Sequence, residues 1–269
     1  MVAQIIIGFI GLVLIAIPFS KAKKKIQIKS IALAIVFQIF LAFLLIEIPV
    51  INDIFFYLSL GVEKLQLATN AGTSFVFGYL SMGIGEELIF AFKILPLIIV
   101  ISSLTALLWY LNILPKIIKA ISFIFEKIFN IGGPVGLGAT ANIIMGQVEA
   151  PLLVRPYLSK MSNKELLILM TAGMSTVSGS IMIALVSMLQ IQFENINLVQ
   201  HLITASILSI PAAIMYANIL IPSDSVTDYK ESKISKIYES SMDAITKGTR
   251  DGLEIAVNVG AILVAFIAL

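Results

Sequence analysis

The sequence has no cysteine, one histidine and few charged residues, and each scarcity excludes a class of function. Without cysteine, the chain has no disulfide, thiolate metal site or cysteine nucleophile. The single histidine, His201, has neither a second histidine for a metal nor the partners of a catalytic triad. Charged residues make up 13% of the chain, and a net charge of +2 is too small to indicate nucleic-acid binding. We therefore predict neither an enzyme nor a nucleic-acid-binding protein, and no cofactor.

Apolar residues, by contrast, make up 59% of the chain, and the mean hydropathy is +1.02. This composition is typical of membrane proteins, in which about 20 apolar residues cross the bilayer. We expect an all-α fold of polytopic transmembrane helices with interfacial amphipathic helices. The predicted spans are residues 2–19, 31–50, 91–111, 166–189, 202–221 and one that starts at 253. Residues 51–92 are predicted as interfacial helix and loop, residues 114–129 as an amphipathic helix, and Ile234, Ile237 and Ile245 indicate a second amphipathic helix.

The basic residues predict how the chain is oriented. Five lysines separate the first two spans, and the positive-inside rule places them in the cytoplasm, with the N-terminus outside. Of the eighteen basic residues, only Lys64 and Lys93 fall on the outer side of this map. We expect a multi-pass protein of the inner (plasma) membrane.

One polar cluster interrupts an apolar stretch between Lys127 and Arg155. Gln147 and Glu149 lie two residues apart, between Gly146 and Pro151. The stretch is too short for two full spans, and basic residues flank both ends. The sequence therefore predicts a re-entrant helical hairpin that turns at residues 146–151. A carboxylate at membrane depth is a functional-site hypothesis by default; Glu149 is either a substrate contact or a structural carboxylate held by helix N-termini.

The centre of the predicted span 166–189 is rich in small and hydroxylic residues, from Gly173 to Ser180. One interpretation is a tight face for helix packing. The other is a helix that unwinds at mid-depth and offers carbonyl groups to an ion. The sequence leaves both open.

Several segments together resemble the concentrative nucleoside transporter family. The resemblance is close over about residues 75–224, and the hairpin motif is its most specific part. The segments that carry it are Phe90 to Pro96, Ala141-Asn142, Gly146 to Leu152, Thr171 to Met174 and Gly179-Ser180.

The resemblance implies a homotrimeric, sodium-coupled secondary transporter that imports nucleosides, with sodium as the coupling ion. It implies that Gln147, Val148 and Glu149 meet the nucleobase and that Ile181 packs on it. It places Asn142, Met145, Thr176 and Val177 at the sodium site. Val148 stands where the family usually has threonine or serine, which removes a hydroxyl hydrogen bond to the base.

The family's second hairpin and the helices after it would follow Leu269, so we expect the chain to hold one half of an inverted-repeat transporter core. The predicted regions are scaffold and interfacial helices in 1–129, the hairpin with two transmembrane helices in 130–222, and an amphipathic segment with the start of a further span in 223–269. Three alternatives remain: a proton-coupled transporter in which Glu149 titrates, a non-transporting truncated membrane protein, and an intramembrane enzyme.

Overall fold

The computed structural model describes residues 2–82, 90–147, 149–189, 196–223 and 237–269. All regular secondary structure in these residues is helical. Five of the described helical segments are long and apolar enough to cross a membrane: Ile28–Glu47, Phe90–Tyr110, Asn163–Leu189, Leu198–Leu220 and Ser241–Ala268. These findings confirm the predicted all-α membrane fold.

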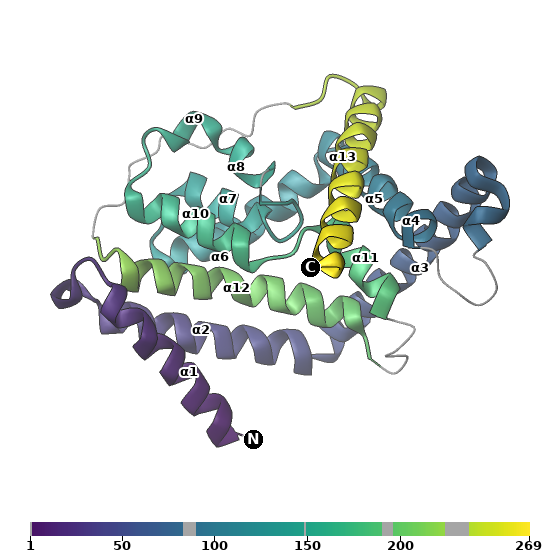
Figure 1. Cartoon of the computed structure of the whole chain (residues 1–269). Helices are drawn as coiled ribbons and strands as arrows, with labels where there is room; N and C mark the ends of the chain where they lie inside the picture. The colour runs from purple at the N-terminus through teal and green to yellow at the C-terminus, as the bar shows by residue number, and fades with distance from the viewer. Residues whose placement is uncertain (1, 83–89, 148, 190–195, 224–236) are drawn as a thin grey trace. The chain divides into compact units, whose positions relative to one another are not determined.

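The helices follow one another in the order labelled in Figure 1. Their bounds are α1 Val2–Ala16, α2 Ile28–Glu47, α3 Pro49–Phe77, α4 Phe90–Lys93, α5 Leu95–Tyr110, α6 Ile113–Phe129, α7 Gly133–Ala141, α8 Glu149–Leu153, α9 Arg155–Leu158, α10 Asn163–Ser175, α11 Gly179–Leu189, α12 Leu198–Leu220 and α13 Ser241–Ala268. Short 3₁₀ turns occupy Ile17–Phe19, Lys23–Lys25 and Gly78–Met82. The predicted amphipathic helix at 114–129 is α6. Of the predicted interfacial segment 51–92, residues up to Phe77 belong to the long helix α3, the 3₁₀ turn follows at Gly78–Met82, and residues 83–89 lie outside the described residues.

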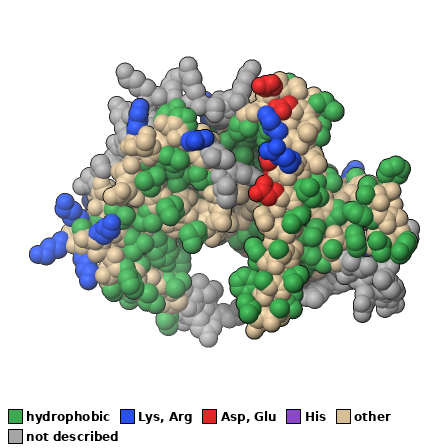
Figure 2. All heavy atoms as spheres, turned by 45° about the horizontal axis from the view of Figure 1, so that its top comes forward, with side chains coloured by type: hydrophobic (Ala, Val, Ile, Leu, Met, Phe, Trp, Pro, Cys, Tyr) green, Lys and Arg blue, Asp and Glu red, His purple; other side chains and the backbone are tan. Residues whose placement is uncertain are grey.

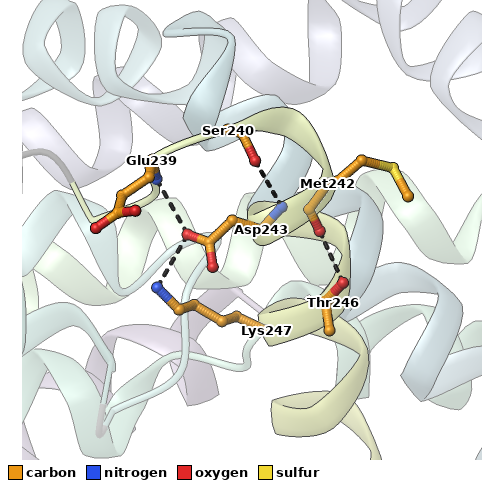
Figure 3. A network of polar contacts seen from close by, with 6 residues as sticks. All are labelled: Glu239, Ser240, Met242, Asp243, Thr246 and Lys247. Carbon is orange, nitrogen blue, oxygen red and sulfur yellow. Dashed lines mark hydrogen bonds and ion pairs between the residues drawn. The ribbon is translucent and has the colours of Figure 1, made fainter.

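The second predicted amphipathic helix is not formed as expected. Ile234 lies outside the described residues, and Ile245 belongs to α13, one unbroken helix of 28 residues. Figure 3 shows why α13 begins where it does: the Ser240 hydroxyl accepts a hydrogen bond from the backbone N–H of Asp243 at 3.0 Å. The Asp243 carboxylate in turn accepts from the Glu239 N–H at 3.0 Å and from Lys247 Nζ at 2.9 Å. This cap fixes the helix start well before the apolar run that predicted the span.

The chain divides into two compact units. The first comprises Met1–Ile48, Ile118–Val177 and Ile203–Ile234. One of its apolar clusters joins α2 to α12 through Ala34, Met215 and Ile219, and Phe129 of α6 packs against the same cluster. Phe37 of α2 meets the Phe129 ring edge-on, with ring centroids 5.5 Å apart.

The second unit comprises Pro49–Ile117, Ser178–Leu202 and Ser235–Leu269. Its centre is the contact between α5 and α13, where Gly248 and Gly252 of α13 lie against the backbone of α5. An apolar cluster of Ile98, Ala184 and Ala256 then joins α5, α11 and α13. Glycines allow the two long helices to approach closely, as in other membrane helix pairs.

The surface matches a membrane environment. Large apolar side chains are exposed along α2, including Val36 at 64% and Phe43 at 62%. Figure 2 shows apolar side chains over much of the visible face and a group of basic side chains at its left edge, the side on which Figure 1 places the turn between α1 and α2. Such extensive exposed apolar surface is unusual in a soluble monomer and is expected where lipid tails are the solvent.

Candidate functional site

The site begins with α7, a short helix made almost entirely of small and apolar residues. Every residue from Pro134 to Ala141 is buried. Pro134 in the first turn suits a helix start, because no hydrogen bond from its nitrogen is needed there. A methyl group added to Gly138 would lie 2.4 Å from Leu169 Cδ2 of α10. The glycine therefore allows α7 and α10 to pack closely.

Asn142 caps the end of α7, and its side-chain oxygen has no partner. Its amide nitrogen donates to the carbonyl of Gly138 at 3.0 Å. The residue is fully buried, and its Oδ1 accepts no hydrogen bond from the residues that the structure describes. The neighbouring Thr140 Oγ1 is buried in the same way. A buried polar atom without a partner is costly, about 1 to 3 kcal/mol, so such atoms call for an explanation.

The segment after Asn142 folds back against α10 at Gly173. A methyl group added to Gly173 would lie 3.1 Å from Gln147 Cβ and 3.3 Å from Asn142 Oδ1. Met145 stays buried, and its N–H donates to the Ala141 carbonyl at 2.8 Å. The absence of a side chain at Gly173 thus brings Asn142 and Gln147 to one place on α10.

Helix α10 is capped at its N-terminus, and extended backbone follows its C-terminus. Ser162 and Glu165 form a reciprocal capping box at the N-terminus. The helix stops at Ser175, and Thr176 is extended, with φ −109° and ψ 160°. The Thr176 hydroxyl donates to the Ala172 carbonyl at 2.9 Å, and the Val177 N–H donates to the Ser206 hydroxyl of α12 at 3.5 Å.

This arrangement is suited to a cation. Helices α7 and α10 both end near the contact of Asn142 with Gly173, and each helix C-terminus carries partial negative charge. The unpartnered Asn142 oxygen adds a third source of negative potential. The described residues contain no cluster of His, Cys, Asp and Glu that could hold a metal. The side-chain oxygen atoms described at this place, on Asn142 and Thr176, are neutral.

The structure brings together only part of the predicted site. Asn142, Gln147 and the C-terminal end of α10 share the first unit. Ile181 belongs to the second unit, where it is half-buried against the cluster of α5, α11 and α13. Val148 and the side chain of Glu149 lie outside the described residues, although the Glu149 backbone opens α8.

Two features differ from the sequence prediction. Pro151 does not mark the turn: it is the third residue of α8, and the non-helical segment is at residues 142–147 instead. A proline in the first helical turn costs no hydrogen bond, which explains the difference. Ser206 was not predicted, because nothing in its own segment indicates that α12 passes the end of α10.

Known proteins match this chain along most of its length. Three family models match successive parts: "Na+ dependent nucleoside transporter N-terminus" over residues 7–80, "Nucleoside recognition" over 91–192 and "Na+ dependent nucleoside transporter C-terminus" over 201–269. The structure of CNTnw in an inward-facing substrate-bound state superposes with a TM-score of 0.87 at 31% identity, covering 99% of this chain and 65% of that one.

Two bacterial relatives are each 32% identical to this chain, and each match covers 98% of it. The nucleoside permease NupC of Helicobacter pylori is covered over 63% of its own length, and the uncharacterized transporter YutK of Bacillus subtilis over 64%. The chain thus spans just under two thirds of the length of these relatives. The family models, the relatives and the solved structure agree with one another, and the chain belongs to the concentrative nucleoside transporter family.

Proposed function

We propose that this chain carries the ion site and the nucleobase side of the substrate site of a sodium-coupled nucleoside importer of the plasma membrane. The observation that carries the proposal is the fully buried Asn142 Oδ1, which has no partner among the described residues and lies beside Gly173 near the ends of α7 and α10. A bound cation gives that oxygen its missing partner. The description "Na+ dependent" of the matching family models supports sodium.

The residues present fit sodium in kind. Na⁺ is a hard ion that prefers oxygen ligands, by the logic that holds for Ca²⁺ and Mg²⁺. Asn142 supplies an amide oxygen, Thr176 a hydroxyl, and the non-helical residues Met145 and Val177 supply backbone carbonyls. None of these groups titrates near neutral pH, so a proton-coupled site would need Glu149 instead.

In the proposed cycle, Gln147 and Glu149 contact the nucleobase and Ile181 packs on it. Gln147 follows Asn142 by five residues in a segment that packs on Gly173. Ion binding at Asn142 therefore orders the segment that presents Gln147. This link explains how sodium raises the affinity for a nucleoside, because the two ligands then stabilise one backbone conformation. We further propose that the protein works as a homotrimer, as the resemblance implies.

Sodium binding can be measured on the chain of 269 residues itself. We expect the thermal unfolding midpoint in detergent to rise saturably with NaCl relative to choline chloride at equal ionic strength. The gain is about 2.7 kcal/mol when sodium is at a hundred times its Kd. Asn142→Ala should remove this gain. Thr204→Val is the matched control, because Thr204 Oγ1 is also buried without a partner but lies on α12.

Equal midpoints of the wild-type chain in both salts would overturn the sodium assignment. If the midpoint instead shifts only with pH in choline chloride, the coupling role moves from Asn142 to Glu149.

The substrate role is tested in a chimera in which residues 1–269 replace the matching segment of the Helicobacter pylori permease. We expect Gln147→Ala to lower sodium-driven nucleoside uptake by about five- to 150-fold at subsaturating substrate, which corresponds to about 1 to 3 kcal/mol for a lost buried hydrogen bond. Gln38→Ala, which alters the same kind of side chain on α2, is the control. Unchanged uptake by Gln147→Ala at wild-type expression would exclude the substrate contact.

A further inference from the structure

A polar hollow lies within the first unit, away from Asn142, where four segments converge. The hollow is partly open to solvent, and its volume, open space included, is about 210 Å³. The walls come from the loop before α2, the start of α2, the start of α10 and the end of α12. The residues that line it are Lys25, Gln27, Ser30, Lys164, Asn218, Pro222 and Ser223.

Hydrogen bonds hold these walls in place. Asn218 Nδ2 donates to the Ser30 hydroxyl at 3.0 Å and so joins α12 to α2. Lys164 Nζ donates to the Ser223 carbonyl at 2.9 Å and joins α10 to the end of α12. The backbone N–H of Lys21 donates to the Leu220 carbonyl at 2.9 Å, which ties the lysine-rich loop to the same helix end. The hollow is therefore a formed site, with one lysine on each of two sides.

The electrostatics of the hollow are positive. Among the residues that the structure describes, no carboxylate lines it. Lys25 is exposed and forms no ion pair or hydrogen bond through its ammonium group within the described part of the chain. Lys21, Lys23, Lys24 and Lys29 lie in the same loop or at the start of α2. Among the acidic side chains described in this unit, Glu165 is engaged in the capping box, Glu126 accepts a hydrogen bond from Ser122, and Glu47 lies at the far end of α2.

Beside this charge runs an apolar surface. Helix α2 starts at the hollow, and its exposed residues include Ile28 at 78%, Leu33 at 44% and Val36 at 64%. The helix continues for 20 residues into the part predicted to cross the bilayer. A ligand that fits both features has an anionic head and a long apolar tail.

We propose that this hollow binds the phosphate headgroup of an anionic phospholipid. The two ammonium groups, the Ser30 hydroxyl and the Asn218 amide supply donors for phosphodiester oxygens. Because the hollow is partly open, the headgroup rests at its mouth and the acyl chains lie along α2. Basic pockets at the cytoplasmic ends of transmembrane helices bind anionic headgroups by this chemistry. The bound lipid would clamp α2, α10 and α12 together.

Native mass spectrometry of the 269-residue chain, titrated with phosphatidylglycerol or phosphatidylcholine, tests the proposal. We expect the wild type to retain phosphatidylglycerol more tightly than phosphatidylcholine. Lys25→Gln with Lys164→Gln should weaken phosphatidylglycerol binding about 30-fold, because each lysine near an anionic surface contributes about fivefold. The control is Lys23→Gln with Lys24→Gln. It also removes two positive charges, both from the loop before α2, but changes no residue that lines the hollow.

The single variant Lys25→Gln keeps the test valid if the double variant misfolds, because the exposed Lys25 side chain makes no contact that the fold needs. We expect its affinity for phosphatidylglycerol to fall about fivefold. Three results would overturn the proposal: equal binding of the two lipids, an equal loss in the control double variant, or an unchanged affinity in the Lys25 and Lys164 double variant. A third arm adds inorganic phosphate. If millimolar phosphate displaces the lipid from the wild type, the hollow is a site for free anions and the lipid assignment is wrong.

Discussion

Two helix contacts in this molecule are built on glycine, one in each unit, and they have different purposes. In the second unit, Gly248 and Gly252 bring α13 against the backbone of α5. In the first unit, Gly138 and Gly173 bring α7 and the segment after it against α10. In both, the missing side chains allow close approach. The difference lies in how near the helix ends are.

The α5–α13 contact lies between two continuous helices, whose backbone groups bond within each helix. The α7–α10 contact lies where both helices stop, and the buried Asn142 oxygen there has no partner among the described residues. Glycine spacing alone therefore does not identify a site. A close contact becomes a candidate ion site when helix ends and an unpartnered buried oxygen meet there.

The largest effect should follow from filling the structural contact. A methyl group on Gly248 would lie 2.6 Å from Ala106 Cβ and 2.8 Å from the Ser102 carbonyl oxygen. We expect Gly248→Val to destabilise the chain by about 3 kcal/mol in detergent unfolding, because the opposing atoms belong to a helix that cannot shift. Gly260→Ala is the control, since its nearest neighbour is the flexible tip of Leu95 at 3.3 Å. Equal stability of the two variants would contradict the close contact.

Filling the contact at the candidate site should have a smaller effect, on sodium affinity and not on folding. Gly173→Ala places a methyl group 3.1 to 3.4 Å from atoms of Gln147 and Asn142, which must shift by a few tenths of an ångström. We expect the chain to stay folded while its sodium affinity, measured from the salt dependence of thermal unfolding, falls about tenfold, as for other changes next to a metal ligand. A variant with lower stability but unchanged sodium affinity would show that Gly173 serves packing alone.

The smallest effect should occur at a glycine that serves neither purpose. Gly61 lies within α3, and a methyl group there would meet nothing within 4 Å. Gly61→Ala should raise the free energy of unfolding by about 0.5 to 1 kcal/mol, because alanine loses less backbone entropy in a helix. A loss of stability would mean that another surface covers this position.

The sequence predicted most spans well because long apolar runs are a local signal, but the predicted span 2–19 is a shorter apolar helix, Ile7–Phe19. Residues 31–50 and 91–111 correspond to α2 and to the Phe90–Tyr110 segment within a few residues. It predicted the first residue of a helix less well where an N-terminal cap determines that residue. Ser240 and Asp243 start α13 in a polar region, so hydropathy placed its beginning too late.

The sequence indicated which residues to consider for the candidate site but not how they are arranged in space. The segment Gly173 to Ser180 left packing and unwinding open, and the structure shows a helix break at Thr176 to Ser178. What decides between them lies outside that segment: Ser206 of α12 accepts the Val177 N–H. No local pattern predicts a partner that is 29 residues away. The roles of Gln147, Val148 and Glu149 remain predictions.

The length of α7 has a consequence for how the protein reaches its native state. Nine residues make a helix of about 14 Å, less than half the hydrocarbon thickness of a bilayer, so α7 is too short to be inserted as an independent span. It must enter with or after α10, the helix against which it packs. The site then forms only once α10 has been synthesised, and a ribosome-bound chain that ends before α10 should leave α7 accessible to water-soluble labels.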